Sequence, residues 1–292
     1  MNTTSRSGLW ALAAISFFWG TTWFTSKIAI TYLPPLQMTG IRQLLAGSLL
    51  IAFYTMKVRK IPPIKDLIFH ALVGFLLFTC SNGMTTWAIQ YIPSFLGALL
   101  GCLMPFVLVL ANYLLFKEKV KPLAFLGLAI GFVGVAILLS SFATEIKETH
   151  FVWGVLITMV GVLTWTSGTL ITTRNKRNID PFEGLGWQML FGGAMMLLIS
   201  GVMDEQVNLL TLPIKAWLLI GYLIAVGSIF CFVCYLHALK TLPLSLVSVY
   251  VYINPIVALL MGVLFLHEVI TWQIVVGVLV VFSGIYLVKR YR

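Results

Sequence analysis

The chain has 292 residues, of which 60% are hydrophobic and only 10% carry a charge, and its mean hydropathy is +1.01. A soluble protein would contain roughly a quarter charged residues, so this composition excludes an ordinary soluble domain and indicates a polytopic membrane protein. The net charge of +10 would suit a nucleic-acid partner, but the basic residues are scattered over short loops. We therefore expect the protein to lie in a lipid bilayer and to have no nucleic-acid partner.

Ten apolar runs follow one another along the chain, each close to the length of about twenty residues that crosses a bilayer as a helix. The predicted spans are 9–30, 36–56, 67–90, 94–116, 122–141, 151–173, 182–201, 214–238, 244–266 and 272–288. In lipid only helices and closed barrels satisfy every backbone polar group, and runs of this length are typical of helices rather than barrel strands. The sequence therefore predicts an all-α integral membrane protein with ten transmembrane helices.

Lysine and arginine are concentrated in alternate loops. If the N-terminus is cytoplasmic, fifteen of the nineteen basic residues fall on the cytoplasmic side, and only Lys147 and Lys215 lie in outer loops. The positive-inside rule then predicts that both termini are cytoplasmic, which agrees with an even number of spans.

Prolines, tryptophans, glycines and a glutamate of the first half recur in the second half at a nearly constant displacement. The pairs displaced by 150 residues are Pro93 and Pro243, Pro105 and Pro255, and Glu118 and Glu268, and those displaced by 146 are Trp19 and Trp165, and Gly47 and Gly193. Landmarks in register indicate an internal duplication, with one repeat over 1–146 and a second over 147–292. Each repeat holds five spans, an odd number, so the second is inverted, as in many secondary transporters.

Three motifs resemble a known family. The first span contains W-G-T-T-W-F-T-S-K from Trp19 to Lys27, the second contains R-Q-L-L-A-G from Arg42 to Gly47, and the fourth ends in L-L-F-K-E. Together with the duplication, these motifs are similar to those of the EamA family of the drug/metabolite transporter superfamily. The resemblance implies a ten-helix bundle in the bacterial plasma (inner) membrane that transports or exports small metabolites, commonly amino acids.

A cargo site in such a protein should lie near the membrane midplane, between the two halves. Aromatic and polar residues in the middle of predicted spans are the candidates for substrate binding. They are Trp19, Trp23, Gln43, Asn82, Trp165, Thr169, Gln188, Tyr250 and Asn254. The alternative is that the tryptophans only pack against nearby glycines and that the asparagines hydrogen-bond between helices.

Two cations lie within or at the edge of spans, Lys27 and Arg42. A charge at such depth is costly unless it pairs, snorkels or faces water. The two residues could contact the carboxylate of an amino acid or organic acid, or they could have a structural or gating role. We favour the second because their repeat mates, Thr173 and Gln188, are neutral and the resemblance implies cations here whatever the cargo.

Pro105 and Pro255 fall in the middle of the fourth and ninth spans. Each is expected to kink its helix and to free the carbonyl group four residues earlier, at Gly101 and Val251, for cargo or water.

The nine acidic residues all lie at or near predicted span ends. Small multidrug exporters of the same superfamily exchange protons for cationic drugs through a carboxylate at the bilayer centre, so its absence argues against lipophilic cations as cargo. No cluster with metal-ligand or nucleophile spacing and no phosphate-binding loop occurs, so we expect no metal, no cofactor and no enzyme.

These observations favour a secondary transporter that exports small metabolites, with amino acids first, by alternating access between the repeats. The alternative is a nucleotide-sugar, sugar-phosphate or other organic-solute exchanger of the same superfamily, although nucleotide sugars would require basic residues from both halves. One chain carries both repeats, so either a monomer or a homodimer would suffice.

Overall fold

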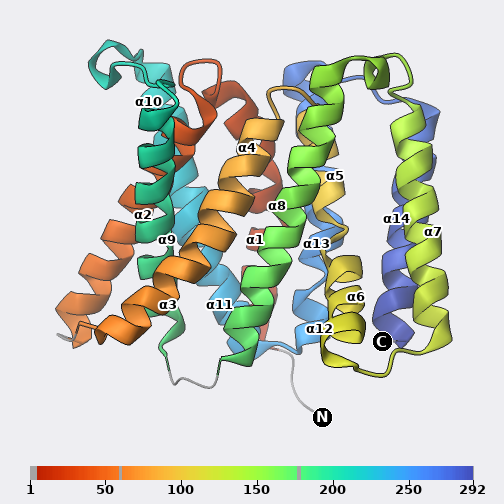
Figure 1. Ribbon diagram of the computed structural model, residues 1–292, viewed down its shortest axis with the longest axis horizontal. Coiled ribbons are helices and arrows are strands. Elements are labelled where there is room, and N and C mark those ends of the chain that lie inside the picture. Colours follow the sequence, from red (N-terminus) through yellow and green to blue (C-terminus); the bar gives the residue numbers. More distant parts are fainter. Residues whose placement is uncertain (1–4, 59–60, 176–178, 292) are drawn as a thin grey trace.

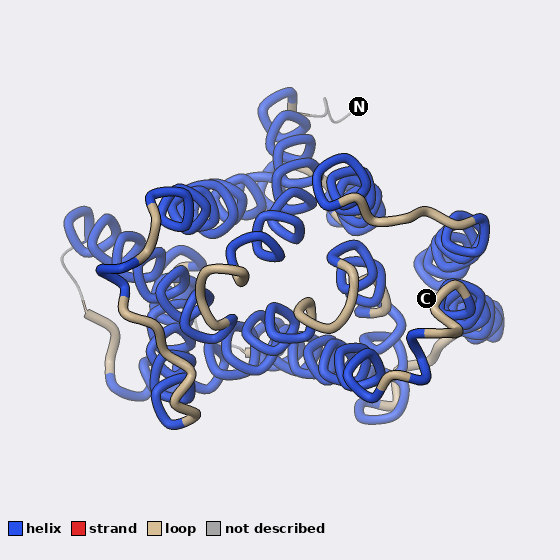
Figure 2. The backbone as a smooth tube through the Cα atoms, turned by 90° about the horizontal axis from the view of Figure 1, so that it is seen from above, coloured by secondary structure: helices blue, strands red, loops and turns tan. Residues whose placement is uncertain are grey.

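The computed structural model describes residues 5–58, 61–175 and 179–291, and every regular element in these ranges is a helix. The long helices run between two opposite sides of the molecule, and α1 (Arg6–Ala29) begins on the lower side, where α14 (Trp272–Tyr291) ends (Figure 1). Seen from above, they form an oblong bundle (Figure 2).

Eight helices or series of helices in the described ranges are long and apolar enough to cross a membrane. They are α2 (Pro35–Val58); α3 (Ile64–Gly74), η1 (Phe75–Gly83) and α4 (Met84–Ala88); α5 (Ser94–Gly101) and α6 (Met104–Phe116); α7 (Pro122–Ser140); α8 (Thr149–Arg174); α9 (Pro181–Val202); α10 (Ile214–Tyr222), η4 (Leu223–Phe230) and α11 (Cys231–Thr241); and α14. The apolar helix α13 (Tyr250–Leu266) follows α12 (Leu244–Val247) and is shorter, whereas α1 has 24 residues but many Trp, Ser and Thr side chains that lower its hydropathy. The all-helical membrane protein expected from the composition is confirmed.

Local sequence explains where several helices begin and end. Pro122 and Pro181 open α7 and α9 at a position where the missing N–H has no intrahelical partner. Asp180 caps α9 by accepting a hydrogen bond from the backbone N–H of Phe182 at 2.8 Å. At the other end, α6 and α13 both stop at a residue in the left-handed conformation, Lys117 and His267, which are repeat mates.

Equivalent helices of the two halves pack against each other. Helix α2 contacts α9, and a Cβ atom added at Gly47 would lie only 2.5 Å from the backbone nitrogen of Leu190. Helix α7 contacts α14 at one end of the bundle, where a Cβ atom added at Gly134 would lie 2.6 Å from the nitrogen of Val281 (Figures 1 and 2). Small residues thus let repeat-related backbones approach closely, as is common between membrane helices.

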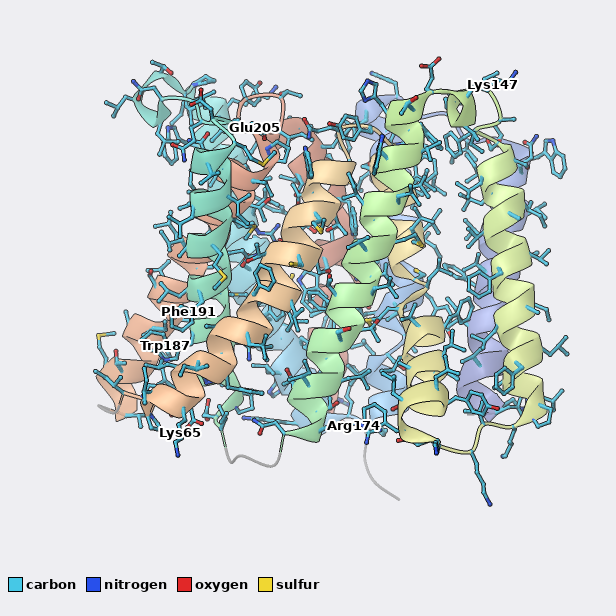
Figure 3. All side chains as sticks on the ribbon, viewed as in Figure 1. Lys65, Lys147, Arg174, Trp187, Phe191 and Glu205 are labelled. Atoms are coloured by element: carbon cyan, nitrogen blue, oxygen red, sulfur yellow. The ribbon has the colours of Figure 1, made fainter. Side chains whose placement is uncertain are left out.

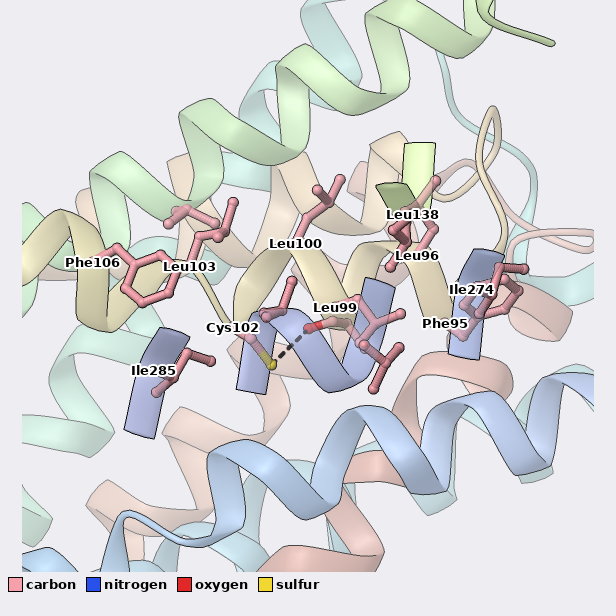
Figure 4. Packing of buried hydrophobic residues seen from close by; sticks show 14 of the residues in the cluster. Phe95, Leu96, Leu99, Leu100, Cys102, Leu103, Phe106, Leu138, Ile274 and Ile285 are labelled. Carbon is pink, nitrogen blue, oxygen red and sulfur yellow. Dashed lines mark hydrogen bonds between the residues drawn. The ribbon is translucent and has the colours of Figure 1, made fainter. Parts of the chain in front are cut away.

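The largest buried cluster surrounds α5 and α6. Phe95, Leu96 and Phe106 are almost fully buried and pack in one cluster with Ile274 and Ile285 of α14 (Figure 4). Large apolar side chains also cover the outside of the bundle; Phe53, for example, is 67% exposed. A soluble monomer rarely exposes so much apolar surface, so this face suits contact with lipid.

Two stretches of π-helix interrupt the long helices of the molecule, one in each half. They are η1, between α3 and α4, and η4, between α10 and α11. A π-helix adds a residue to the turn and often marks a functional position. Both stretches bring polar groups to the site described next.

Candidate functional site

A cavity of about 230 Å³ lies between the helices of the two halves. Its walls come from α1, α2, η1, α4, α5 and α6 of the first half and from α8, α11 and α13 of the second. Nine residues predicted from the sequence lie on its wall: Trp19, Trp23, Arg42, Gln43, Asn82, Trp165, Tyr250, Asn254 and Pro255. The structure therefore brings together most of the side chains that the sequence selected, although a cavity alone does not test their role.

Helical spacing explains how α1 contributes several wall residues. Trp19, Trp23 and Ser26 follow one another at intervals of four and three residues, so they share one face of the helix. Because α1 starts on the lower side in Figure 1, these residues lie in its upper half.

The ring of Trp19 is fixed from several directions. Its Nε1 donates a hydrogen bond of 3.0 Å to the carbonyl oxygen of Gly227 in η4. Its ring centroid lies 5.0 Å from that of Phe232 and 5.4 Å from that of Tyr250. These rings give the cavity a rigid aromatic wall on the side of α11 and α13.

The position of Trp23, the other tryptophan of α1 on the cavity wall, depends on a glycine. A Cβ atom added at Gly97 would lie 2.7 Å from the ring of Trp23, so only glycine allows the ring to lie against α5. Trp165 reaches the cavity from α8, so both halves contribute a tryptophan.

Arg42 brings a positive charge to the wall. It is 5% exposed, and its Nε donates a hydrogen bond of 2.9 Å to Oγ of Ser228 in η4. The lining residues of the described chain include no aspartate or glutamate. Burying a cation without a counter-ion is costly, so a polar or anionic group in the cavity would stabilise this arrangement.

Three side-chain amides lie beside the cavity. Gln43 donates from Nε2 to Oδ1 of Asn82 at 3.1 Å, and its own Oε1 is buried without a hydrogen-bond partner among the described residues. Asn254, oriented so that its amide nitrogen is satisfied, donates to the carbonyl oxygens of Ser16 and Ile15 in α1. Asn254 therefore links two helices, whereas Gln43 keeps a free acceptor.

The two prolines shape neighbouring parts of the cavity wall. Pro105 opens α6 after a break in the helix at residues 102–103, and the wall there is made by its neighbours Gly101 and Met104 rather than by Pro105 itself. Pro255 lies inside α13 and on the cavity wall. Pro255 has no N–H, so the carbonyl group of Val251 lacks its usual helical partner. This carbonyl oxygen instead accepts a hydrogen bond of 3.2 Å from Sγ of Cys102.

Two predicted residues do not line the cavity. The hydroxyl group of Thr169 donates to the carbonyl oxygen of Trp165 at 2.8 Å and stays within α8. Gln188 is buried in α9 near Gly184 and His70. Both were selected as repeat mates or helix neighbours, and neither arrangement guarantees that the side chain faces the same space.

Lys27 lies above the cavity, in a second hollow of about 490 Å³ that Glu145 and Glu268 also line. Its Nζ donates to the carbonyl oxygens of Ile89 and Ile92 at the end of α4, the second at 3.0 Å. A lysine at the C-terminal end of a helix satisfies carbonyl groups that have no intrahelical partner.

Glu268 is a cap on the same upper side. Its Oε1 accepts from the backbone N–H of Ser94 at 2.7 Å and its Oε2 from the Ser94 hydroxyl at 3.1 Å, at the start of α5. Its repeat mate Glu118 instead accepts from Nη2 of Arg174 at 2.6 Å, at the lower end of α8. Arg174 also donates to Oδ1 of Asn112 at 2.9 Å.

Sequence reasoning missed the part played by Arg174 and counted it only as a basic loop residue. A signal was present, because Arg174 follows Thr173, the repeat mate of Lys27, by one residue. Ser228 was also missed, since its only link to Arg42 is through space. Among the described residues, no group of three or more His, Cys, Asp or Glu side chains could hold a metal ion.

A multi-pass helical membrane protein with a solute-sized cavity between two related halves has the architecture of a transporter. The pattern of the EamA-like transporter family matches residues 6–140 and 152–290, so the chain belongs to this family and contains its domain twice. This match confirms the resemblance to the EamA family and the drug/metabolite transporter superfamily.

Known relatives agree with this assignment. An inner membrane transporter of Escherichia coli K12, YedA, is 32% identical over 253 residues, which cover 86% of this chain and 80% of YedA. The transporter YvbV of Bacillus subtilis strain 168 is 28% identical over 283 residues, covering 95% of this chain and 90% of YvbV. A protein solved by crystallography shares the fold, with a TM-score of 0.64 at 18% identity over 99% of both chains. Family and relatives indicate a transporter rather than an enzyme.

Proposed function

We propose that the protein is a secondary transporter of the plasma membrane that exports small metabolites, with amino acids first, by alternating access between two inverted repeats. The observation that carries this proposal is the cavity between the halves, which has aromatic rings, amide groups and one buried cation on its wall. Apolar surface with a few polar groups suits a small amphiphilic solute.

The proposed topology has ten spans with both termini in the cytoplasm. Adding α1 and the α12–α13 series to the eight long apolar segments gives this number, and the polar face of α1 towards the cavity explains its lower hydropathy. Lys65 and Arg174 lie on the lower side, whereas Lys147 and Glu205 lie on the upper side (Figure 3). The positive-inside rule supports a cytoplasmic lower side.

Alternating access requires contacts that close each side in turn. We propose this role for two contacts of the repeat-related glutamates on opposite sides of the molecule: Glu268 with Ser94 above the cavity and Glu118 with Arg174 below it. Together with the paired α2–α9 and α7–α14 helices, they support a mechanism in which the halves exchange roles around one site. Because one chain supplies the whole cavity, a monomer would suffice, and a homodimer would hold two complete sites.

The test is counterflow of a radiolabelled amino-acid panel in liposomes that contain the purified protein. We expect saturable uptake that Trp165→Ala lowers at least tenfold, because the variant removes one wall of the cavity. Trp153→Ala is the matched control: Trp153 lies on the same helix, is 55% exposed and does not line the cavity, so its uptake should stay near that of the wild type.

Absence of uptake of every amino acid by a monodisperse, stably folded preparation would overturn the cargo proposal. Saturable exchange of nucleotide sugars or sugar phosphates in the same liposomes would then favour the alternative. Only one basic residue, Arg42 of the first half, lines the cavity in the described structure, which disfavours that outcome.

A further inference from the structure

Gly101, the last residue of α5, is the only glycine among the described residues that line the cavity. We infer that its missing side chain makes room for the cargo, and that Gly101 determines the largest solute that the transporter accepts. This inference rests on the proposed transport function and adds to it the residue that limits the size of the cargo.

Neither the backbone nor the packing of the protein requires glycine at position 101. No described glycine has a positive φ, so the backbone conformation here is compatible with an ordinary side chain. A Cβ atom added at Gly101 would enter open space, with no packing partner within 4 Å. Because glycine is less favourable than alanine in helices, the missing side chain needs another explanation.

A neighbouring glycine of α5 shows in which direction this open space lies. Gly97 precedes Gly101 by four residues, so the two residues share one face of the helix. A Cβ atom added at Gly97 would lie 2.7 Å from the ring of Trp23, which lines the cavity from α1. This face of α5 is therefore directed towards the cavity, and one turn further along, at Gly101, no side chain of the protein fills the space.

A comparison with Gly221 of α10 shows what distinguishes Gly101. A Cβ atom added at Gly221 would also have no atom within 4 Å, but Gly221 is exposed and does not line the cavity. Gly101, in contrast, is half-buried and lies on the cavity wall. The space beside Gly101 is therefore inside the bundle, where a solute could occupy it.

The repeat mate of Gly101 does carry a side chain. Val251 lies four residues before Pro255, as Gly101 lies four residues before Pro105. Val251 also lines the cavity, and its carbonyl oxygen accepts from Sγ of Cys102, the residue after Gly101, at 3.2 Å. The two equivalent positions thus lie close together on the wall, and only the position in the first repeat leaves space for cargo.

The residue at position 101 should therefore decide which solutes fit. An apolar wall distinguishes solutes mainly by their volume, and one methylene group changes this discrimination about tenfold or more. Alanine at position 101, and leucine still more, would occupy space that a large cargo needs. A small cargo would be affected less.

The first measurement needs no cargo. Gly101→Ala and Gly101→Leu should have melting temperatures in detergent equal to or above that of the wild type, because the new side chains enter open space. Gly97→Ala should melt at a lower temperature, because its Cβ atom would meet the ring of Trp23. A fall for Gly101→Ala as large as that for Gly97→Ala would show that the space is filled and would overturn the inference.

The second measurement is counterflow of radiolabelled L-alanine in liposomes that contain the full chain, with unlabelled L-alanine and L-tryptophan as competitors. The size ratio is the concentration of L-tryptophan that gives half-inhibition divided by that of L-alanine. We expect Gly101→Leu to raise the size ratio at least tenfold and Gly101→Ala to raise it less. Gly221→Leu is the matched control: it adds the same side chain outside the cavity and should leave the size ratio unchanged.

The repeat mate provides a variant with the opposite effect. Val251→Ala shortens a side chain of the same wall, so it should lower the size ratio below that of the wild type. Combined with Gly101→Ala, it should bring the raised size ratio back towards that of the wild type. A recovery of this kind cannot come from a misfolded protein.

The outcomes separate this inference from the transport proposal. Saturable counterflow by the wild type with a size ratio that Gly101→Leu leaves unchanged, or that Gly221→Leu raises equally, would overturn the role of Gly101 and leave the transporter intact. No saturable counterflow of any amino acid by the folded wild type would overturn both.

Discussion

At the scale of single residues, the cavity wall depends on side chains held by backbone groups of distant helices. Trp19 donates to the carbonyl oxygen of Gly227, 208 positions later in the chain. Arg42 donates to Ser228, the next residue. Two adjacent residues of η4 therefore position both the aromatic ring and the cation, which gives this irregular stretch a specific structural task.

Two substitutions of Trp19 distinguish the contribution of its ring to stability from the contribution of its hydrogen bond. Trp19→Phe keeps an aromatic ring but leaves the carbonyl group of Gly227 without this donor, so we expect a loss of about 0.5–1.5 kcal/mol in the free energy of unfolding. Trp19→Ala should cost about 3–5 kcal/mol because it also leaves a cavity. Thermal unfolding in detergent measures both.

Trp10→Phe is the control for this series, since Trp10 lies on the same helix and is 77% exposed. Its melting temperature should match that of the wild type. Equal stability of Trp19→Phe and the wild type would show that the bond to Gly227 contributes nothing.

At the scale of helices, close backbone contact between the repeat-related helices α2 and α9 leaves no room for a larger side chain. A Cβ atom added at Gly47 would lie 2.5 Å from the nitrogen of Leu190 and 2.7 Å from the carbonyl oxygen of Gly186. Gly47→Ala should therefore force α2 and α9 apart and destabilise the protein by about 1–3 kcal/mol.

Gly221 is a matched comparison for Gly47, and its replacement by alanine should raise the stability of the protein instead of lowering it. Gly221 lies in α10 with no atom within 4 Å of an added Cβ atom. Gly221→Ala should stabilise the protein by about 0.5–1 kcal/mol, because alanine favours the helix over glycine. Melting temperatures that fall equally in both variants would contradict the contact between α2 and α9 as the cause.

Much of the helical architecture could be predicted because apolar runs and prolines are local signals. The predicted span 122–141 corresponds to α7 over Pro122–Ser140, and Pro105 marks the point where α5 and α6 separate. The π-helical stretches could not be predicted, since nothing in their composition distinguishes them from α-helix and tertiary packing decides the extra residue per turn.

The site could be predicted in part. Trp19 and Trp165 reach one cavity because the duplication places them at equivalent depths in α1 and α8. Gln188, the repeat mate of Arg42, does not reach it and lies in α9 beside Gly184. Arg174 and Ser228 depend on partners far away in the sequence, which no local pattern reveals.

At the scale of the whole molecule, the part of the cavity wall that the structure describes offers no side chain that usually carries a proton near neutral pH. The described lining contains no Asp, Glu or His. Side chains of these types are the usual proton carriers in this range of pH. The proposed transport should therefore equilibrate its cargo rather than concentrate it.

We expect a pH gradient across the liposome membrane to leave the final internal concentration of a transported amino acid unchanged. Steady-state uptake of the radiolabelled amino acid with and without the gradient measures this. Accumulation above the external concentration only when the gradient is present would require a proton carrier outside the cavity wall.

The contact between Arg174 and Glu118 on the lower side and the contact between Glu268 and Ser94 on the upper side respond differently to dissolved ions. Arg174 and Glu118 are 41% and 48% exposed, so their attraction passes largely through solvent and weakens as ionic strength rises. Glu268 is held by two hydrogen bonds to Ser94, which salt affects far less. With the lower side in the cytoplasm, as proposed, a rise in cytoplasmic ionic strength would weaken the contact between Arg174 and Glu118 while leaving the contact between Glu268 and Ser94 nearly unchanged.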